Sequence, residues 1–308
     1  MADEGDGPKD RELTEKEKKE IAKWFLANAP TGEIQYVAKD VRALIADDHL
    51  YGTAAAEAFP LFNKAHLVVL EMPNRSGDVI ISSFGEIDKD KYLDPRTAQV
   101  ATVDHVKQIC TKVRPATDEE LSSAYVEDFR FAVDSELCKY VVDTYPKGAS
   151  SVYCTRGKDV DGPGADFDLA VVISASKTSP QNFCNGSWRS IWTLEFKDDL
   201  QSVEVNGKIQ VVAHYFEEGN VQLDAKNECR DSTILQSPDD CAIALTSIIC
   251  HHEAEYMASL EEAYLHLPDT TFKDLRRKLP VTRTLFPWQN TLQFSLNRDI
   301  SREFGIGK

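Results

Sequence analysis

An acidic segment is the first place where this sequence could hold a metal ion or a pair of catalytic carboxylates. Residues 159–168 contain four aspartates with Gly and Pro between them. If Asp159 is the first position of a calcium-binding loop, the fifth is Pro163 and the twelfth is Ala170, so the chelating glutamate is missing. Gly- and Pro-rich stretches are typical of solvent-exposed turns. We therefore expect a turn between strands, and an enzymatic role for these carboxylates is the less favoured alternative.

A second candidate is the histidine pair His251 and His252, which lies inside a predicted helix. Adjacent helical residues point about 100° apart, so these two side chains cannot grip one metal ion as residues four apart can. The sequence also contains none of the motifs of phosphate loops, dinucleotide-binding folds, zinc proteases or serine hydrolases. These patterns predict a protein without enzymatic activity, metal or cofactor.

The segment 272–308 has a charge pattern unlike the rest of the chain. It carries eight basic and three acidic residues, a net charge of +5 in a chain whose formal net charge is −16. Apolar residues lie between the basic ones and then recur at i+4 spacing, which makes the segment amphipathic. Such segments bind acidic partners, grooves or membranes, or pack on their own protein, and periodicity alone leaves these possibilities open. The residues concerned are Lys273, Arg276, Arg277, Lys278, Arg283, Arg298, Arg302 and Lys308 among the basic ones, and Phe272, Leu275, Leu279, Trp288, Leu292, Leu296, Ile300 and Phe304 among the apolar ones.

Composition excludes several classes of protein. A formal net charge of −16 argues against general nucleic-acid binding, which depends on Lys and Arg displacing counterions from phosphates. The sequence has no apolar run long enough to span a bilayer, and its first residues are charged. Its seven cysteines are widely spaced and form no C-x-x-C pair. We therefore expect a cytoplasmic protein with reduced cysteines.

The elements that would position these residues begin with helices. Residues 1–12 are charged and we expect them to be disordered. A helical subdomain is predicted over 13–65, where Thr14 and Glu17 form a capping box for the first helix and Thr31 caps the second. A third helix is predicted over 53–63, interrupted at Pro60.

The middle of the chain alternates between short β-rich runs and one helix. Residues 66–116 read as short strands and loops. A capping box at Thr117 and Glu120 predicts a helix over 117–146. Residues 147–236 then read as an antiparallel sheet, with a hairpin turn at Asn206-Gly207 and a second turn at residues 218–220.

The longest predicted helix covers 237–268, where Ser237, a following proline and two aspartates favour a helix start. Its apolar residues form one continuous seam, and a helix of this length extends beyond what a sheet of short strands would cover. We therefore expect a partner to cover the excess. Strands followed by a long helix, with no alternating βαβ pattern, predict an α+β fold, and 269–308 form a C-terminal tail.

Six stretches of the chain resemble the alpha subunits of F-actin capping protein, and one of them is Asp-Val-Arg-Ala-Leu at 40–44. Three others are Lys-Trp-Phe-Leu-Ala-Asn-Ala-Pro-Thr-Gly-Glu at 23–33, Leu-Asp-Pro-Arg at 93–96 and Asn-Phe-Cys-Asn-Gly-Ser-Trp-Arg-Ser at 182–190. The two most specific are Lys-Ile-Gln-Val-Val-Ala-His-Tyr-Phe-Glu-Glu-Gly-Asn-Val-Gln-Leu at 208–223 and Asp-Thr-Thr-Phe-Lys-Asp-Leu-Arg-Arg-Lys-Leu-Pro-Val-Thr-Arg-Thr at 269–284. The resemblance therefore spans most of the chain.

This resemblance implies a mushroom-shaped obligate heterodimer with a beta subunit, in which the N-terminal helices belong to the stalk and the strands of both subunits join one sheet. The basic tail would be a tentacle that binds the barbed end of the actin filament independently of calcium. We place this actin-binding site at Lys273, Arg276, Arg277, Arg283, Trp288 and Leu292. Acidic phospholipids and stalk-binding regulatory proteins are further implied partners. The alternative is a scaffold that binds acidic phospholipids or another partner through the tail alone.

Overall fold

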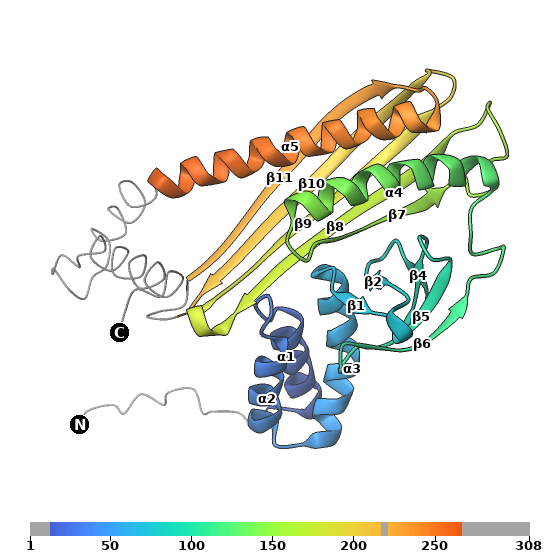
Figure 1. Ribbon diagram of the computed structural model, residues 1–308. Helices are drawn as coiled ribbons and strands as arrows, with labels where there is room; N and C mark the ends of the chain where they lie inside the picture. Colours follow the sequence, from blue (N-terminus) through green and yellow to red (C-terminus); the bar gives the residue numbers. More distant parts are fainter. Residues whose placement is uncertain (1–12, 217–220, 267–308) are drawn as a thin grey trace, which may run out of the picture. The chain divides into compact units, whose positions relative to one another are not determined.

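The computed structural model describes residues 13–216 and 221–266 and combines helices with antiparallel sheets (Figure 1). This agrees with the predicted α+β class. Its contacts divide the chain into two compact units, Met1–Cys250 and His251–Lys308. Three predicted features lie outside the described residues: the disorder of 1–12, the turn at 218–220 and the tail at 269–308.

Three helices open the first unit. The capping box predicted at Thr14 is confirmed, because its hydroxyl accepts from the backbone N–H of Glu17 and the Glu17 carboxylate accepts from the N–H of Thr14. Thr31 does not cap the second helix, which starts after Glu33. The helices share an apolar core that includes Leu26, Phe59 and Phe62. They are α1 (Glu15–Ala27), α2 (Ile34–Ile45) and α3 (Asp48–Ala65).

The prediction that Pro60 interrupts the third helix is wrong. Helix α3 begins at Asp48 behind the capping side chain of Asp47 and continues through Pro60 to Ala65. Proline removes one backbone hydrogen bond from a helix interior. The neighbouring Phe59 and Phe62 are almost completely buried against α1 and α2, and this packing offsets the missing bond.

Short strands follow. Tyr92 and Ile81 lie in their shared core, together with Met72. The strands form a two-stranded sheet in the order β1-β2 and a four-stranded sheet in the order β3-β4-β5-β6. The elements are β1 (Val69–Glu71), η1 (Pro73–Arg75), β2 (Asp78–Ile80), β3 (Glu86–Asp88), β4 (Lys91–Asp94), β5 (Gln99–Asp104) and β6 (Ile109–Pro115).

The capping box predicted at Thr117 does not open a helix. Helix α4 covers Ala124–Thr144, and Ser123 caps it by accepting from the N–H of Val126. Glu120 does accept from the N–H of Thr117, but its carboxylate is also held by the Arg114 guanidinium at 2.6 Å. This ion pair to the preceding strand fixes the segment as a turn.

The largest sheet has five antiparallel strands in the order β11-β10-β9-β8-β7 (Figure 1). Its core contains Phe167 and Phe196, whose rings stack with centroids 4.3 Å apart, and Phe129 of α4 packs against both. The elements are β7 (Ala149–Arg156), β8 (Phe167–Ser179), η2 (Pro180–Asn182), β9 (Cys184–Lys197), β10 (Ser202–Tyr215) and β11 (Val221–Ile234).

The predicted hairpin turn at Asn206-Gly207 is wrong, because β10 runs through both residues without a break. Gly207 pairs with Trp192 of β9 in the ladder. A Cβ atom at Gly207 would lie 2.2 Å from a ring carbon of Trp192, whose side chain is completely buried. Glycine therefore stands here to make room for the indole ring.

Helix α5 (Pro238–His266) is the longest element and continues from the first unit into the second. Ser237 caps it by accepting from the N–H of Asp240 at 3.3 Å. Within the first unit it buries Cys241, Leu245 and Ile249. No helix among the described residues is both long and apolar enough to cross a membrane.

Candidate subunit interface

The predicted actin-binding residues lie outside the described part of the chain. The structure therefore places none of the following six side chains: Lys273, Arg276, Arg277, Arg283, Trp288 and Leu292. The candidate sites that it does place are the acidic turn, the histidine pair, one small hollow, and the surfaces of the large sheet and of the first helices.

The acidic turn is tied to the large sheet by ion pairs. Asp168 accepts a two-pronged hydrogen bond from Arg156, with Nε–Oδ2 and Nη2–Oδ1 distances of 2.6 and 2.8 Å. Asp166 accepts from the backbone N–H of Asp198 at 3.1 Å. These contacts join β7, β8 and β9. Among the described residues, no three His, Cys, Asp or Glu side chains gather closely enough to hold a metal ion.

The histidine pair considered as a candidate metal site lies on the described part of α5. The ring centroids of His251 and His252 are 5.7 Å apart and the rings are tilted relative to each other by 55°.

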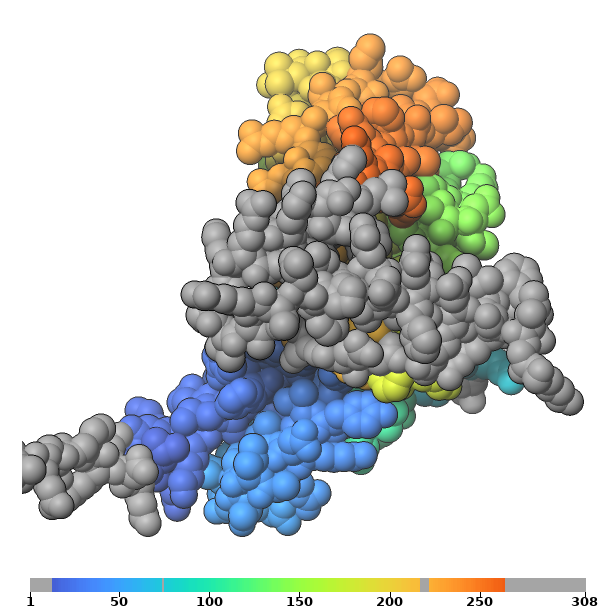
Figure 2. Space-filling view, turned by 90° about the vertical axis from the view of Figure 1, so that its left-hand side faces the viewer, coloured from blue at the N-terminus to red at the C-terminus, as the bar shows by residue number. Residues whose placement is uncertain are grey.

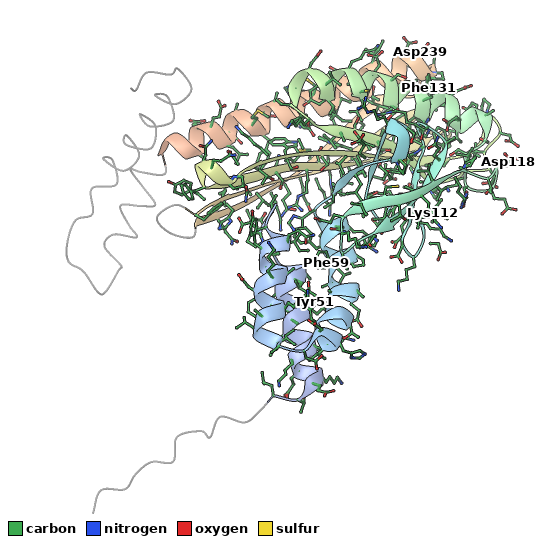
Figure 3. The ribbon with its side chains drawn as sticks, turned by 60° about the horizontal axis from the view of Figure 1, so that its bottom comes forward. Tyr51, Phe59, Lys112, Asp118, Phe131 and Asp239 are labelled. Carbon is green, nitrogen blue, oxygen red and sulfur yellow. The ribbon has the colours of Figure 1, made fainter. Side chains whose placement is uncertain are left out.

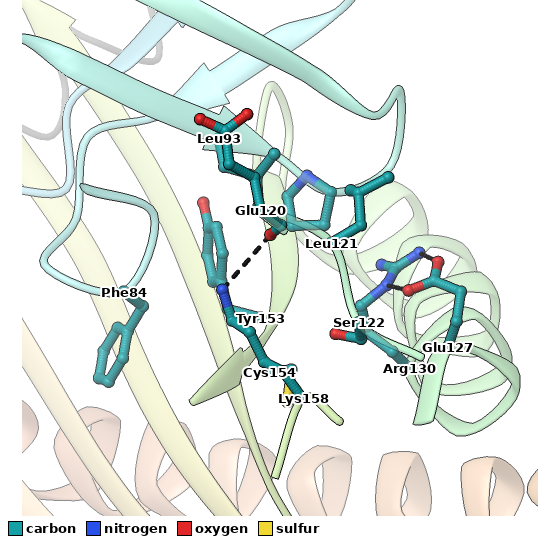
Figure 4. Close-up of a pocket in the computed structure, with 11 residues that line it drawn as sticks. Phe84, Leu93, Glu120, Leu121, Ser122, Glu127, Arg130, Tyr153, Cys154 and Lys158 are labelled. Atoms are coloured by element: carbon teal, nitrogen blue, oxygen red, sulfur yellow. Dashed lines mark hydrogen bonds and ion pairs between the residues drawn. The ribbon is translucent and has the colours of Figure 1, made fainter. Parts of the chain in front are cut away.

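A small hollow lies beside the start of α4 (Figure 4). Its charged groups already have contacts within the protein: Arg130 pairs with Glu127, and Lys158 donates to the backbone carbonyl of Glu120 at 3.3 Å. The hydrogen bond from Arg114, with that from the Thr117 N–H, lowers the pKa of Glu120 to about 2.

Strand β11 forms one edge of the large sheet. Among the described residues its only strand neighbour is β10, to which it is paired over fourteen positions. An edge strand presents a row of unpaired backbone N–H and C=O groups that a further strand can complete. Beyond its first residues this strand is charged and lacks apolar alternation, so the sequence pattern does not reveal its full length.

Large apolar side chains are also exposed on α4, α5 and β11. On α4 these are Phe131, 60% exposed, and Val142, 70% exposed; Figure 3 shows Phe131 on this helix. Ile243 of α5 is 60% exposed and Ile234 of β11 is 65% exposed. Exposed apolar residues that gather in one patch are typical of a surface that another protein covers.

The first helices expose a second apolar group of residues. Trp24 and Phe25 of α1 contact each other edge to face at 5.2 Å and are more than half exposed. Tyr36 and Leu44 of α2 are 59% and 85% exposed. These helices form the blue surface in Figure 2. Leu44 is exposed although it lies only three residues after the buried Val41.

A polar junction joins the helices to the large sheet. Glu33, at the start of α2, accepts from Asn185 Nδ2 at 3.0 Å and contacts Nδ1 of buried His214. Thr31 lies 3.3 Å from both Ser187 and His66 through its hydroxyl. This is what Thr31 does in place of capping α2.

Two further details fix this junction. Gly32 has a φ of +78°, a backbone conformation that favours glycine. A Cβ atom at this position would also lie only 2.9 Å from the hydroxyl oxygen of Thr178. Burial and the nearby Arg189 lower the pKa of His66 to about 4, which keeps this imidazole neutral. Sequence reasoning missed the junction because its partners are far apart along the chain.

The Leu-Asp-Pro-Arg stretch at 93–96 has a structural role. Arg96 donates two hydrogen bonds of 2.8 Å to the carboxylate of Asp134 on α4 and a third, of 3.1 Å, to the carbonyl of Ser150 on β7. Asp134 is buried, and Arg96 therefore links α4 and β7 to the connection between β4 and β5 of the four-stranded sheet.

Comparisons with known proteins agree with the sequence resemblance. A family model described as the F-actin capping protein alpha subunit matches residues 22–299. A curated protein of Arabidopsis thaliana named F-actin-capping protein subunit alpha is 64% identical over 308 residues, covering all of both chains. A protein of the same name from Dictyostelium discoideum is 36% identical and covers 92% of this chain and 97% of its own.

The fold also matches a solved structure. The homodimeric actin capping protein alpha subunit from Plasmodium berghei aligns with a TM-score of 0.70 at 22% identity, covering 87% of this chain and 99% of that one. At that identity the likeness concerns the fold alone.

Proposed function

This chain belongs to the family of F-actin capping protein alpha subunits, and from that premise we propose that it joins a beta subunit and caps the barbed end of the actin filament. Capping blocks the addition and loss of actin subunits and regulates filament assembly. It is an act of binding, so the proposal needs no cofactor, metal or chemical step and places the protein at the cytoskeleton in the cytoplasm. The observation that carries it is the full-length match, at 64% identity, to a protein named F-actin-capping protein subunit alpha.

The exposed surfaces support a partner subunit. A beta subunit with its own edge strand would extend the large sheet at β11, and its helices would cover exposed residues such as Phe131, Val142 and Ile243. The exposed aromatic residues of α1 suit a stalk shared by two subunits, as in a mushroom-shaped heterodimer. On this proposal the chain made alone does not persist as a stable monomer.

The proposed actin-binding site is the basic tail, acting as a tentacle. Lys273, Arg277 and Arg283 lie in a segment of net charge +5, whereas the chain as a whole carries −16. A local field of this sign attracts an acidic filament end, and Arg276, Trp288 and Leu292 would add contacts once the tail is bound. Cations at an interface chiefly speed encounter, and those that lose their water on binding also slow release.

The test is a barbed-end elongation assay on the heterodimer, made by co-expression with a beta subunit. Replacing Lys273, Arg277 and Arg283 together by Ala is expected to weaken capping by at least about 3 kcal/mol, more than a hundredfold, if two of them are desolvated. Association with filament ends should also depend less on salt than in the wild type. Co-purification of the beta subunit and circular dichroism should not change.

A matched control removes the same charge elsewhere. Lys39, Lys89 and Lys112 are exposed, and replacing all three by Ala changes the net charge equally without touching the tail. If the tail variant folds, assembles and caps as well as this control, the tail is not the binding site.

The basic tail also favours a second candidate function, which is binding to acidic phospholipids. Regulatory proteins would bind to the stalk. Liposomes with and without phosphatidylserine separate the two functions. Tail-dependent liposome binding without any effect on filament ends would replace the capping proposal with a lipid-binding scaffold.

A further inference from the structure

The helical bundle, residues 13–65, is joined to the sheets by a single covalent connection. Residues 66–68 lead from α3 into β1, and Leu67 has a φ of +46°, in the left-handed region. The bundle has an apolar core of its own, and the short strands have another. Polar side chains make much of the remaining attachment, and two of them are the histidines His66 and His105.

His105 lies in the turn after β5 and contacts the last turns of α3. Asn63 of α3 donates from Nδ2 to the carbonyl oxygen of His105 and to its ring nitrogen Nδ1, both at 3.1 Å. The carbonyl only accepts, and Gln108 donates to Asn63 Oδ1 at 2.8 Å, so the orientation of this amide is fixed. Nδ1 of His105 is therefore an acceptor. The ring carries its proton on Nε2, which lies 3.3 Å from the hydroxyl of Tyr92.

This arrangement requires a neutral imidazole at position 105. A second ring proton would sit on Nδ1 and point at the NH2 group of Asn63, so that two donors would face each other. His105 is only 5% exposed, and little water is available to accept this proton instead. Protonation therefore breaks the contact between the turn after β5 and helix α3.

Charged groups from several elements surround His105. Asp90, whose Oδ1 lies 3.5 Å from Nε2, favours the protonated ring, as do Glu86 and Asp104. Burial opposes it most, and Lys64 of α3, which is bound to Glu86 at 2.9 Å, opposes it too. The net effect lowers the pKa of His105 from its ordinary value. The attached bundle thus favours the neutral ring.

His66 follows α3 and responds to acid in the same sense. Its Nδ1 lies 3.3 Å from the Thr31 hydroxyl, and its ring stacks on Phe62 with centroids 4.0 Å apart. Arg189 of β9 donates to the carbonyl of Ala65, and its buried Nε has no hydrogen-bond partner among the described residues. Protonation of His66 would place a second cation beside this arginine. Burial and Arg189 accordingly lower the pKa of His66 to about 4.

The other charged groups of the junction do not require a neutral histidine. Glu33 contacts Nδ1 of His214 on β10, and a carboxylate pairs with a charged imidazole as well as with a neutral one. Asp224 of β11 acts on Arg189 and favours its charge. Acid therefore weakens the two histidine contacts described above and leaves this third contact in place.

We propose that the attachment of the helical bundle is sensitive to acid. Protonation of His105 and His66 releases the bundle from the sheets, so that it turns about residues 66–68 while the apolar cores on both sides stay folded. The released state binds more protons than the attached state, and a fall in pH shifts the equilibrium toward it. This device is independent of capping, since no residue of the tail takes part.

Hydrogen exchange followed by mass spectrometry tests the release. The full-length chain is measured between pH 7.5 and 4.5 in the form in which it purifies, and rates are corrected for the intrinsic pH dependence of amide exchange. A pKa of about 4 for His66 in the attached state, against about 6.5 when released, allows a shift of roughly 70-fold at pH 4.5. Peptides covering 63–69 and 104–109 should therefore exchange at least about tenfold faster at pH 4.5. Core peptides covering 22–26 and 190–196 should change by less than about twofold.

Replacing both histidines separates their effect from a general effect of acid. The double variant His66→Gln and His105→Gln has no ring to protonate at either place, so exchange at 63–69 and 104–109 should no longer depend on pH. The matched control replaces two exposed histidines, His49→Gln and His251→Gln, and should respond to acid like the wild type.

Asn63→Asp reverses the requirement at position 105. Its carboxylate would accept from the protonated Nδ1 of His105, so peptide 104–109 should be better protected at pH 5.5 than at pH 7.5. NMR titration of labelled imidazole rings should also show a higher pKa for His105 in this variant than in the wild type.

Three results would overturn the proposal. The first is wild-type exchange that rises together in the junction and core peptides, which would mean global unfolding. The second is an acid response that survives in the double glutamine variant. The third is an Asn63→Asp variant that opens in acid as the wild type does.

Discussion

Replacement of Gly207 by Ala tests whether the large sheet depends on space for an indole ring. The added Cβ would meet three carbon atoms of the six-membered ring of Trp192, at 2.2, 2.4 and 2.8 Å. Carbon atoms in proteins normally approach to about 3.5–4.0 Å. The ring must therefore move by more than about 1 Å, in a site where Trp192 is completely buried.

The size of the effect follows from two opposing contributions. Overpacking a core costs about 1–3 kcal/mol, and three simultaneous contacts place this site near the upper end. Alanine in a strand recovers about 0.5–1 kcal/mol of backbone entropy relative to glycine. We expect a net loss of about 2 kcal/mol in the free energy of unfolding. Urea unfolding of the heterodimer, at one fixed protein concentration, measures it.

Two controls make the result specific. Gly52 of α3 has open space around its Cβ position, so Gly52→Ala should be neutral or stabilise by up to about 1 kcal/mol. Trp192→Phe replaces the two-ring indole by a smaller single ring, and Gly207→Ala should cost less in that background. If Gly207→Ala leaves the unfolding midpoint unchanged, or costs the same in the Trp192→Phe background, the steric explanation fails.

Three further outcomes are expected. Because the pKa of His66 is about 4 in the folded chain and about 6.5 when unfolded, the unfolded state binds more protons between these values. Stability should therefore fall as pH drops from about 6.5 to about 4. The variant His66→Gln should show a smaller dependence of the unfolding free energy on pH in this range. An equally steep dependence in that variant would mean that another group causes the effect. Arg96→Ala leaves the buried Asp134 carboxylate without its partner and should cost about 2–4 kcal/mol in urea unfolding, with Asp134→Asn in the same chain recovering part of it. Asp168→Asn removes one ion pair at the acidic turn and should leave filament capping within about twofold of the wild type; lost capping in a folded heterodimer would make this turn functional.

The sequence predicted the parts of the fold that depend on local signals. The capping box at Thr14 opens a helix as predicted, whereas the carboxylate of Glu120 in the matching motif is bound by Arg114. Asn206-Gly207 has the local signature of a turn, yet a tryptophan on the next strand determines its conformation. Contacts with residues that are distant in the sequence cannot be predicted from the local sequence pattern.

The interface was harder to predict for a different reason. Among the described residues, β11 pairs with β10 alone. Much of β11 is charged and lacks apolar alternation, so the sequence pattern did not mark it as a strand. The predicted actin-binding residues rest on family resemblance in segment 269–284, outside the described part of the chain. The proposed subunit surface rests on the exposure of residues such as Phe131 and Val142, which the sequence alone does not give.

The polar junction also has a consequence for the order of events during protein synthesis. Glu33 and His214 are 181 residues apart, and Glu33 and Asn185 are 152 apart. At roughly 5–20 residues per second, a ribosome needs about 10–40 s to deliver His214 after Glu33. The three first helices have their own apolar core and can pack during that interval. The three helices can therefore fold while Glu33 is still exposed to water. The contacts of Glu33 with the sheet form only after β10 has been synthesised.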